Sequence, residues 1–293
     1  MKPPRFSYVA PTTLDNALEL LAQLGEDAKV LSGGQSLVPL MNLRFARPSY
    51  VIDVNRIESL SYIREDGDTL CIGSLTRHQT LSTSPLVQRR CPLLAAAASQ
   101  IGYPAIRYRG TIGGSLAHAD PVAELPCIAV TLGAEIVIER VGAERRVMQA
   151  ADFLRSVFTT ALEPDEMITE VRVPCIDGPG SRWGFREFAR KRGDFAIVIC
   201  AVVVELRDGT AASTRIGIAG ASDTAVRSST AEATLDGVDL DRTAVVAASH
   251  SAATAATPIS DAHASSEYRR HLVEVLTQRT LHDALRSQGG AVG

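Results

Sequence analysis

Two short segments rich in glycine and hydroxyl side chains offer the clearest binding chemistry in this sequence. One is Ser32-Gly33-Gly34-Gln35-Ser36 and the other is Thr111-Ile112-Gly113-Gly114-Ser115. Glycine has no Cβ, so the backbone can approach a ligand closely and direct several N–H groups at one anion. The adjacent hydroxyls add donors without adding charge. Both segments therefore suit a diphosphate, although a Gly-Gly pair between hydroxyl residues is more often an ordinary tight turn.

The common nucleotide-binding patterns do not describe these two segments. Neither contains Gly-x-Gly-x-x-Gly followed by a helix and an acidic residue about twenty positions later. Neither contains the Gly-Lys-Ser/Thr of a phosphate-binding loop. A dinucleotide, if bound, must be held in another way.

The first segment lies within a predicted α/β unit. Thr12 and Thr13 can cap a helix over 14–24, whose leucines are spaced by three and four residues and which Gly25 ends. A strand over 28–31 then leads into the glycine segment, and a second strand is predicted over 50–54.

The second segment lies in a longer region that begins near Ile57. Turn-forming residues over 175–180 predict that this region ends there, at a domain boundary. The predicted strands are Thr69–Ser74, Ala134–Glu139 and Ile168–Val173, and the predicted helices are Pro92–Ile101 and Pro121–Leu132.

A third region reads as strands followed by helices, which is typical of an α+β lobe. The predicted strands are Ala196–Val204 and Arg215–Ala219, and the helices are Ala231–Leu235, Arg242–Ser251 and Glu267–Leu285. The glycine-rich tail over 289–293 is expected to be disordered.

Composition narrows the class of protein. The 293 residues are 45% apolar and 22% charged, with no uninterrupted apolar run of about twenty residues, so no membrane span is expected. The N-terminus lacks the apolar core of a secretion signal, which favours the cytoplasm. A net charge of −3 and only 5% aromatic residues argue against nucleic-acid binding.

The five cysteines do not form a recognisable metal or disulfide pattern. Their number is odd, and no two are closer than twenty positions. Iron–sulfur and zinc ligands are spaced more tightly, so we expect small buried side chains and no metal site.

The glycine segments resemble the two flavin motifs of a known family. Lys29–Leu37 is similar to A-G-G-Q/H-S-L, and Arg109–Pro121 is similar to T-I-G-G-N/S followed by A-D-P. These motifs belong to the FAD-binding medium subunits of molybdenum hydroxylases of the carbon monoxide dehydrogenase and xanthine dehydrogenase type. The resemblance continues at 8–12, 190–196 and 217–221; Ser32 replaces alanine, Ser115 often corresponds to asparagine, and Phe195 occupies a variable position.

This resemblance implies a fold and its domains. The expected fold class is α+β: an FAD-binding domain of the vanillyl-alcohol-oxidase (PCMH) type, followed by a C-terminal α+β domain. The implied boundaries are 1–176 for the FAD-binding domain, with subdomains of about 1–56 and 57–176, and 177–288 for the C-terminal domain.

The resemblance also implies which residues meet the FAD. Glu124 stands where relatives have aspartate, and Arg186 where lysine is common. Gln35 cannot form the covalent flavin bond that a histidine forms in some proteins of this fold, so noncovalent FAD is expected. The implied cofactor-binding residues are Lys29, Val30, Leu31, Ser32, Gly33, Gly34, Gln35, Ser36, Ile101, Thr111, Ile112, Gly113, Gly114, Ser115, Asp120, Glu124, Ile168, Arg186 and Asp194.

No catalytic acid or base is assigned. His118 and Asp120 form either an acid–base pair or, as we favour, a polar loop beside the flavin. His78 is read as a surface or helix-start residue rather than a cofactor contact. Arg190-Lys191-Arg192 is either a solvated cluster or a mobile loop at the flavin edge.

The function implied by the resemblance is electron relay. Molybdopterin on a large subunit and 2Fe-2S clusters on a small subunit would pass electrons to this chain's FAD, and then to NAD, a quinone or oxygen. A dimer of heterotrimers is the expected assembly. Two alternatives remain: a self-sufficient flavin oxidoreductase of the same fold, and a cofactor-free assembly protein.

Overall fold

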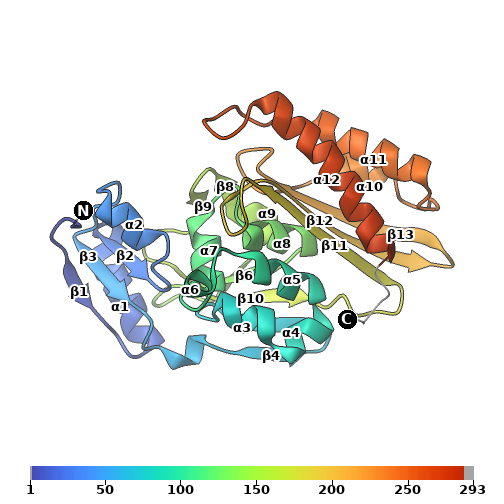
Figure 1. Cartoon of the computed structure of the whole chain (residues 1–293). Coiled ribbons are helices and arrows are strands. Elements are labelled where there is room, and N and C mark those ends of the chain that lie inside the picture. The colour runs from blue at the N-terminus through green and yellow to red at the C-terminus, as the bar shows by residue number, and fades with distance from the viewer. Residues whose placement is uncertain (1, 287–293) are drawn as a thin grey trace.

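The computed structural model describes residues 2–286, so the tail at 289–293 lies outside the described residues. Figure 1 shows three regions in chain order: a small N-terminal unit, a central region rich in short helices, and a C-terminal sheet covered by two long helices. The α+β fold class is therefore confirmed.

The N-terminal unit is a three-stranded parallel sheet, in the order β1-β3-β2, with two helices. Helix α1 begins after Thr13, whose hydroxyl accepts a hydrogen bond from the Asn16 N–H (3.3 Å), and it ends at Gly25 with φ of 49°. The predicted helix and first strand are confirmed. The elements are β1 (Ser7–Val9), α1 (Leu14–Leu24), β2 (Ala28–Leu31), α2 (Leu37–Asn42) and β3 (Tyr50–Asp53).

The central region is a five-stranded antiparallel sheet, in the order β4-β5-β10-β6-β7, with helices packed on one face. Its strands are β4 (Ile63–Asp66), β5 (Thr69–Gly73), β6 (Glu135–Glu139), β7 (Arg146–Gln149) and β10 (Met167–Pro174). Its helices are α3 (His78–Thr83), α4 (Pro85–Arg90), α5 (Pro92–Gln100), α6 (Pro104–Arg107), α7 (Ile112–His118), α8 (Glu124–Leu132) and α9 (Ala150–Phe153). A small hairpin, β8 (Leu154–Ser156) and β9 (Thr159–Thr160), precedes β10.

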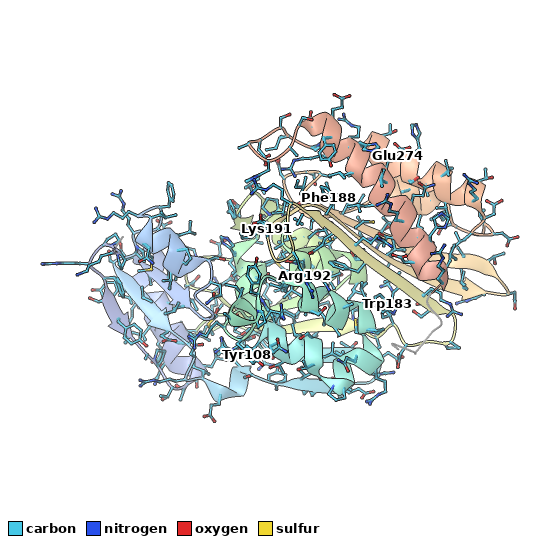
Figure 2. All side chains as sticks on the ribbon, in the orientation of Figure 1. Tyr108, Trp183, Phe188, Lys191, Arg192 and Glu274 are labelled. Atoms are coloured by element: carbon cyan, nitrogen blue, oxygen red, sulfur yellow. The ribbon has the colours of Figure 1, made fainter. Side chains whose placement is uncertain are left out.

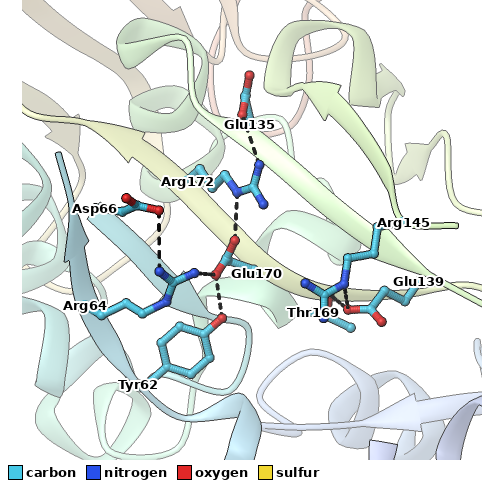
Figure 3. Close-up of polar contacts among 9 residues, drawn as sticks. All are labelled: Tyr62, Arg64, Asp66, Glu135, Glu139, Arg145, Thr169, Glu170 and Arg172. Carbon is cyan, nitrogen blue, oxygen red and sulfur yellow. Dashed lines mark hydrogen bonds and ion pairs between the residues drawn. The ribbon is translucent and has the colours of Figure 1, made fainter. Parts of the chain in front are cut away.

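The opposite face of this sheet carries an ion-pair network (Figure 3). The Glu170 carboxylate accepts hydrogen bonds from the Tyr62 hydroxyl (2.6 Å), Arg172 Nε (2.7 Å) and Arg64 Nη2 (3.0 Å). Burial opposes ionisation of Glu170, but these three donors outweigh it and lower its pKa. The same carboxylate, together with burial, raises the pKa of Tyr62 to about 12.

The C-terminal region is a four-stranded antiparallel sheet in the order β11-β12-β13-β14. Its strands are β11 (Ser181–Ala189), β12 (Ala196–Arg207), β13 (Thr210–Ala219) and β14 (Val226–Arg227). Its helices are α10 (Ser229–Ala233), α11 (Arg242–Ala255) and α12 (Ser266–Arg286).

Strand β12 belongs to two hydrophobic cores at once. Ile199, Ala201 and Val203 pack with the helices of the central region, whereas Val198 and Val202 pack under α11 and α12. A strand covered on both faces needs apolar residues at consecutive positions, which explains the unbroken apolar run of the sequence. The central region therefore shares the first of these two cores with the C-terminal sheet.

Four of the five cysteines are buried, as expected for small apolar side chains: Cys71, Cys91, Cys127 and Cys200. Cys175 is only partly buried. Between residues 2 and 286, no helix combines the length and apolar composition needed to cross a bilayer.

Gly217 of β13 supports this shared core, because it lies directly against helix α8. A Cβ at this position would overlap Thr131 Oγ1, which donates to the Cys127 carbonyl (2.7 Å). Overpacking of this kind costs about 1–3 kcal/mol. We therefore expect Gly217→Ala to lower the free energy of unfolding by roughly 2 kcal/mol, measured by urea denaturation.

Two further variants test this explanation. Adding Thr131→Ala removes the hydroxyl that the new methyl group meets, so it should restore part of the lost stability. Gly178→Ala is the matched control, because its Cβ would meet only Glu205 Oε2, at 4.0 Å. An equal loss in Gly178→Ala and Gly217→Ala would contradict the packing argument.

Candidate functional site

The two glycine segments face each other across the boundary between the N-terminal unit and the central region. Thr111 Oγ1 donates to Ser32 Oγ (3.1 Å), although the two residues are 79 positions apart. A Cβ on Gly33 would lie 2.5 Å from the Arg109 carbonyl oxygen and 2.7 Å from Gly110 Cα. The segments can therefore meet only because residue 33 has no side chain.

The first segment offers free backbone donors. It follows strand β2 as an open turn, with Gly34 at φ of 74°. Within residues 2–286, the N–H groups from Gly33 to Ser36 donate to no protein acceptor. The Ser36 hydroxyl is also without a protein partner in the described chain. These donors are available for the diphosphate that the sequence predicted here.

The second segment differs from its prediction as a second backbone-amide cradle. It is the capped start of helix α7: the N–H groups of Ile112 and Gly113 donate to the carbonyls of Thr76 and Ser74, and that of Gly114 donates to Thr111 Oγ1. These three N–H groups already have acceptors within the protein, so they are not free to bind a ligand. Ser115 keeps a hydroxyl without a partner among the described residues.

The glycines of the second segment serve close packing instead. A Cβ on Gly113 would lie 2.6 Å from Ser74 Cβ, and one on Gly114 would lie 2.8 Å from both Ser32 Oγ and Thr111 Oγ1. The contact at Gly114 therefore places the start of helix α7 against Ser32 of the first segment.

Helix α7 connects the glycine segments to a group of acidic residues. Its seven residues span about 10 Å, and the chain then passes Asp120, whose carboxylate accepts the Val122 N–H (2.9 Å). Glu124 is the first residue of α8, and its charge interacts with that of Glu187 on β11.

Burial dominates the electrostatics of this acidic group. It raises the pKa of Glu124 to about 8, helped by the negative charges of Glu187 and Asp120. Burial alone raises the pKa of Glu187 to about 7, and its Oε2 has no hydrogen-bond partner among the described residues. Both carboxyls are therefore harder to ionise than a glutamate in water.

Glu187 was missed by the sequence analysis. On β11, Trp183 and Phe185 point toward the core of the central region, and residue 187 continues the same alternation. A partly buried carboxyl at an inward position of a strand is unusual, and this pattern of alternation would have singled it out.

Arg186, which the resemblance implies as a cofactor contact, lies away from this acidic group. It points to the opposite face of β11, where its guanidinium forms two hydrogen bonds with Asp283 of α12 (2.5 and 3.0 Å). Adjacent strand residues face opposite sides of a sheet, so Arg186 and Glu187 cannot serve the same site.

Ile101 and Ile168 are nearly buried in the core of the central region, 8% and 4% exposed respectively. Tyr103, just after Ile101, contacts the loop between β11 and β12, where a Cβ on Gly193 would meet its ring at 3.1 Å. Lys191 and Arg192 lie exposed on this loop (Figure 2).

The remaining charged and histidine candidates are placed as follows. Asp194, on the same loop, pairs with Arg190 (3.5 Å). His118 ends helix α7 and does not lie in a loop, and its ring packs on Phe158 with centroids 4.9 Å apart, which favours a packing role over an acid–base pair. Lys29 is exposed on β2. His78 is the first residue of α3, as one of its two expected positions had it, but its side chain is buried and does not lie at the surface.

The fold and this site define a class: a protein that holds a diphosphate-bridged cofactor between a parallel α/β unit and an α+β region. The free amides and the glycine contact fit a diphosphate, and the carboxyls of Glu124 and Glu187, at the other end of α7, suit a polyhydroxyl chain.

Comparison with known proteins gives the family. Residues 4–176 match the family described as "FAD binding domain in molybdopterin dehydrogenase", and 183–284 match "CO dehydrogenase flavoprotein C-terminal domain". The alpha subunit of the 6-hydroxypseudooxynicotine dehydrogenase complex of Paenarthrobacter nicotinovorans is 42% identical, with 97% of this chain and 96% of the relative covered.

Comparison with solved structures gives the same family. Carbon monoxide dehydrogenase from Hydrogenophaga pseudoflava matches with a TM-score of 0.95 and 41% identity, over 98% of this chain and 99% of that one. Quinoline 2-oxidoreductase from Pseudomonas putida 86 matches with a TM-score of 0.92 and 34% identity, over 98% and 99%. The chain belongs to the family of FAD-binding medium subunits of molybdopterin dehydrogenases.

The acidic group predicts a pH dependence of stability. A carboxyl whose pKa is higher in the folded than in the unfolded chain favours folding at low pH, and this contribution is lost as pH rises from about 4.5 through the folded pKa. Glu187→Gln removes one such carboxyl, and it also removes the negative charge that raises the pKa of Glu124. We expect the variant to lose less stability than the parent between about pH 5 and pH 8, by roughly 1 kcal/mol after solvent screening.

Urea denaturation of the cofactor-free chain at both pH values measures this difference. Glu19→Gln, which alters an exposed carboxylate of α1, is the control and should keep the parent's pH dependence. Parallel pH profiles for parent and Glu187→Gln would show that Glu187 is ionised in the folded chain across this range.

Proposed function

We propose that this chain is the electron-relay subunit of a heteromeric molybdenum hydroxylase, and that it holds one noncovalent FAD. Electrons arrive from 2Fe-2S clusters on a small partner subunit, after a molybdopterin-bearing large subunit has oxidised the substrate. The isoalloxazine of FAD supplies the redox chemistry, and the protein binds and orients it. NAD, a quinone or oxygen then accepts the electrons.

One observation carries the FAD assignment: the free N–H groups of 33–36 lie at the contact between two segments that are distant in the chain. Four free N–H groups on consecutive residues suit a diphosphate, which accepts several hydrogen bonds and carries charge. The proposed contacts are the backbone of 32–36, the hydroxyls of Ser36 and Ser115, and Glu124. Gln35 donates its amide to the Gly33 carbonyl (3.0 Å), so it shapes the turn.

The proposed domain organisation follows the chain's three regions. Residues 1–176 form the FAD-binding domain, with subdomains of about 1–56 and 57–176, and 177–288 form the C-terminal domain. The family matches over 4–176 and 183–284 support this division. Relatives named as medium chains, such as that of Hydrogenophaga pseudoflava carbon monoxide dehydrogenase, support the heteromeric assembly, which we propose to be a dimer of heterotrimers.

FAD binding is tested first. The purified chain, supplied with FAD, should absorb near 450 nm, and acid precipitation should release FAD into the supernatant because no covalent bond holds it. Absence of flavin absorbance after reconstitution would favour a cofactor-free assembly protein. Flavin that stays with the acid precipitate would contradict noncovalent binding.

Gly33→Ala tests the site. The new methyl group would lie 2.5 Å from the Arg109 carbonyl oxygen and force the glycine segments apart. We expect FAD affinity to fall at least about tenfold, equivalent to roughly 1.4 kcal/mol, as measured by quenching of flavin fluorescence.

Gly178→Ala, in an open loop, is the matched control and should bind FAD like the parent. Unchanged affinity in a folded Gly33→Ala chain would place the cofactor elsewhere.

A further inference from the structure

Asn55 lies between the two glycine segments and contacts the first of them. It follows strand β3, and its Nδ2 donates to the Ser32 carbonyl (2.7 Å) and to Asp53 Oδ1 (2.6 Å). The Asp53 carboxylate is itself held by the Tyr8 hydroxyl (2.6 Å). Asn55 is therefore fixed in orientation, with its amide nitrogen toward the first segment and its Oδ1 free to accept.

Arg77 completes the connection to the second segment. Its Nη2 donates to Asn55 Oδ1 (2.6 Å), and its Nη1 donates to the Arg109 carbonyl oxygen. Its backbone pairs with Thr111 as an isolated antiparallel bridge, and the next N–H, of His78, donates to the Gly110 carbonyl (3.0 Å).

The carbonyl that Arg77 binds is the one that limits the approach of Gly33. The Arg109 oxygen is the nearest atom to a Cβ built on Gly33. One hydrogen-bonded chain, from the Ser32 carbonyl through Asn55 and Arg77 to the Arg109 carbonyl, therefore spans the contact between the segments. Its length fixes how far apart they lie.

Arg77 also has no close ion-pair partner. Within residues 2–286, no carboxylate lies within 4.0 Å of its guanidinium, and the charge of Asp53 acts on it only from a longer distance. Arg64, Arg90 and Arg172, in contrast, each have at least one carboxylate within 4.0 Å. A part-buried cation beside free backbone donors favours an anion at that place.

We propose that Asn55 and Arg77 form a clasp that holds the two glycine segments at the spacing a diphosphate requires, and that this clasp sets the affinity for FAD. Both are positioning residues, since they act through the backbone of 32–36 and 109–111. The inference rests on the proposed function.

The clasp is accessible from solvent. Asn55 and Arg77 line a surface hollow of about 360 Å³ together with Ile57, Glu58, Ser61 and Leu75. Substitutions here leave the apolar cores intact, and free guanidinium can reach the position of the lost side chain.

The experiment compares FAD affinity of the full chain and its variants by flavin fluorescence quenching. Arg77→Ala removes the clasp. Asn55→Asp keeps the acceptor for Arg77 but loses the donor to Ser32 and adds a charge beside Asp53. We expect both variants to bind FAD about tenfold or more weakly, and Arg77→Lys, with one compact charge, to be intermediate. The double variant should be no weaker than the weaker single variant, because both residues act through one connection.

Rescue separates positioning from a general effect on folding. Millimolar guanidinium should restore much of the affinity of Arg77→Ala, and it should not change that of the parent. The control is Arg64→Ala, which breaks the ion pair with Glu170 on the far face of the sheet and should bind FAD like the parent (Figure 3).

The outcomes are separable. Folded Arg77→Ala and Asn55→Asp chains that bind FAD within about twofold of the parent would overturn the clasp, as would equal weakening in Arg64→Ala. If Arg77→Ala does not fold, the FAD affinities of Arg77→Lys and Asn55→Asp test the clasp in its place. A parent chain that binds no FAD would overturn the proposed function, and the clasp with it.

Discussion

The close approach of two backbone segments at Gly33 is the constraint on which the site depends. The Arg109 carbonyl and Gly110 Cα occupy the space that a Cβ at position 33 would need. Segments 79 positions apart can meet here only if residue 33 has no side chain and if other groups hold them in register. The Thr111 hydroxyl supplies one such group, and the Asn55 and Arg77 side chains supply another. The N-terminal unit is joined to the central region at the place where the cofactor is expected.

The two glycine motifs look alike in sequence but have different roles in the fold. The first follows a parallel strand as an open turn, so its N–H groups have no internal partners in the described chain. The second starts a helix, and its N–H groups bond to the carbonyls of 74 and 76 and to the Thr111 cap. Both Gly-Gly pairs allow close packing, but only the first leaves its N–H groups free, because the local backbone, and not the residue type, decides which donors stay free.

Local signals in the sequence predicted much of the fold. Helix α1 has a cap, a leucine stripe and a terminal glycine within one segment, and β2 is bounded by turn residues, so both were located correctly. The candidate site was predictable at 32–36 for the same reason. The sequence could not show that Arg186 pairs with Asp283, because these residues meet only when α12 packs on β11. Strand β11 was itself missed, and with it the inward position of Glu187. Asn55 and Arg77 carry no motif, since their role arises only where two distant segments come together.

The position of the site at a boundary links cofactor binding to the docking of the N-terminal unit. Apolar packing across this boundary comes mainly from Leu60, Leu75 and Met167, which join the small core of α1 and β3. A diphosphate bound to 32–36 and to Ser115 adds contacts to both sides at once. FAD binding and docking of the N-terminal unit on the central region are coupled equilibria. If docking strengthens FAD binding, FAD binding stabilises the docked state by the same free energy, because such coupling is reciprocal. Docking and cofactor affinity therefore change together, so residues that do not themselves bind the flavin can still determine how tightly it is held.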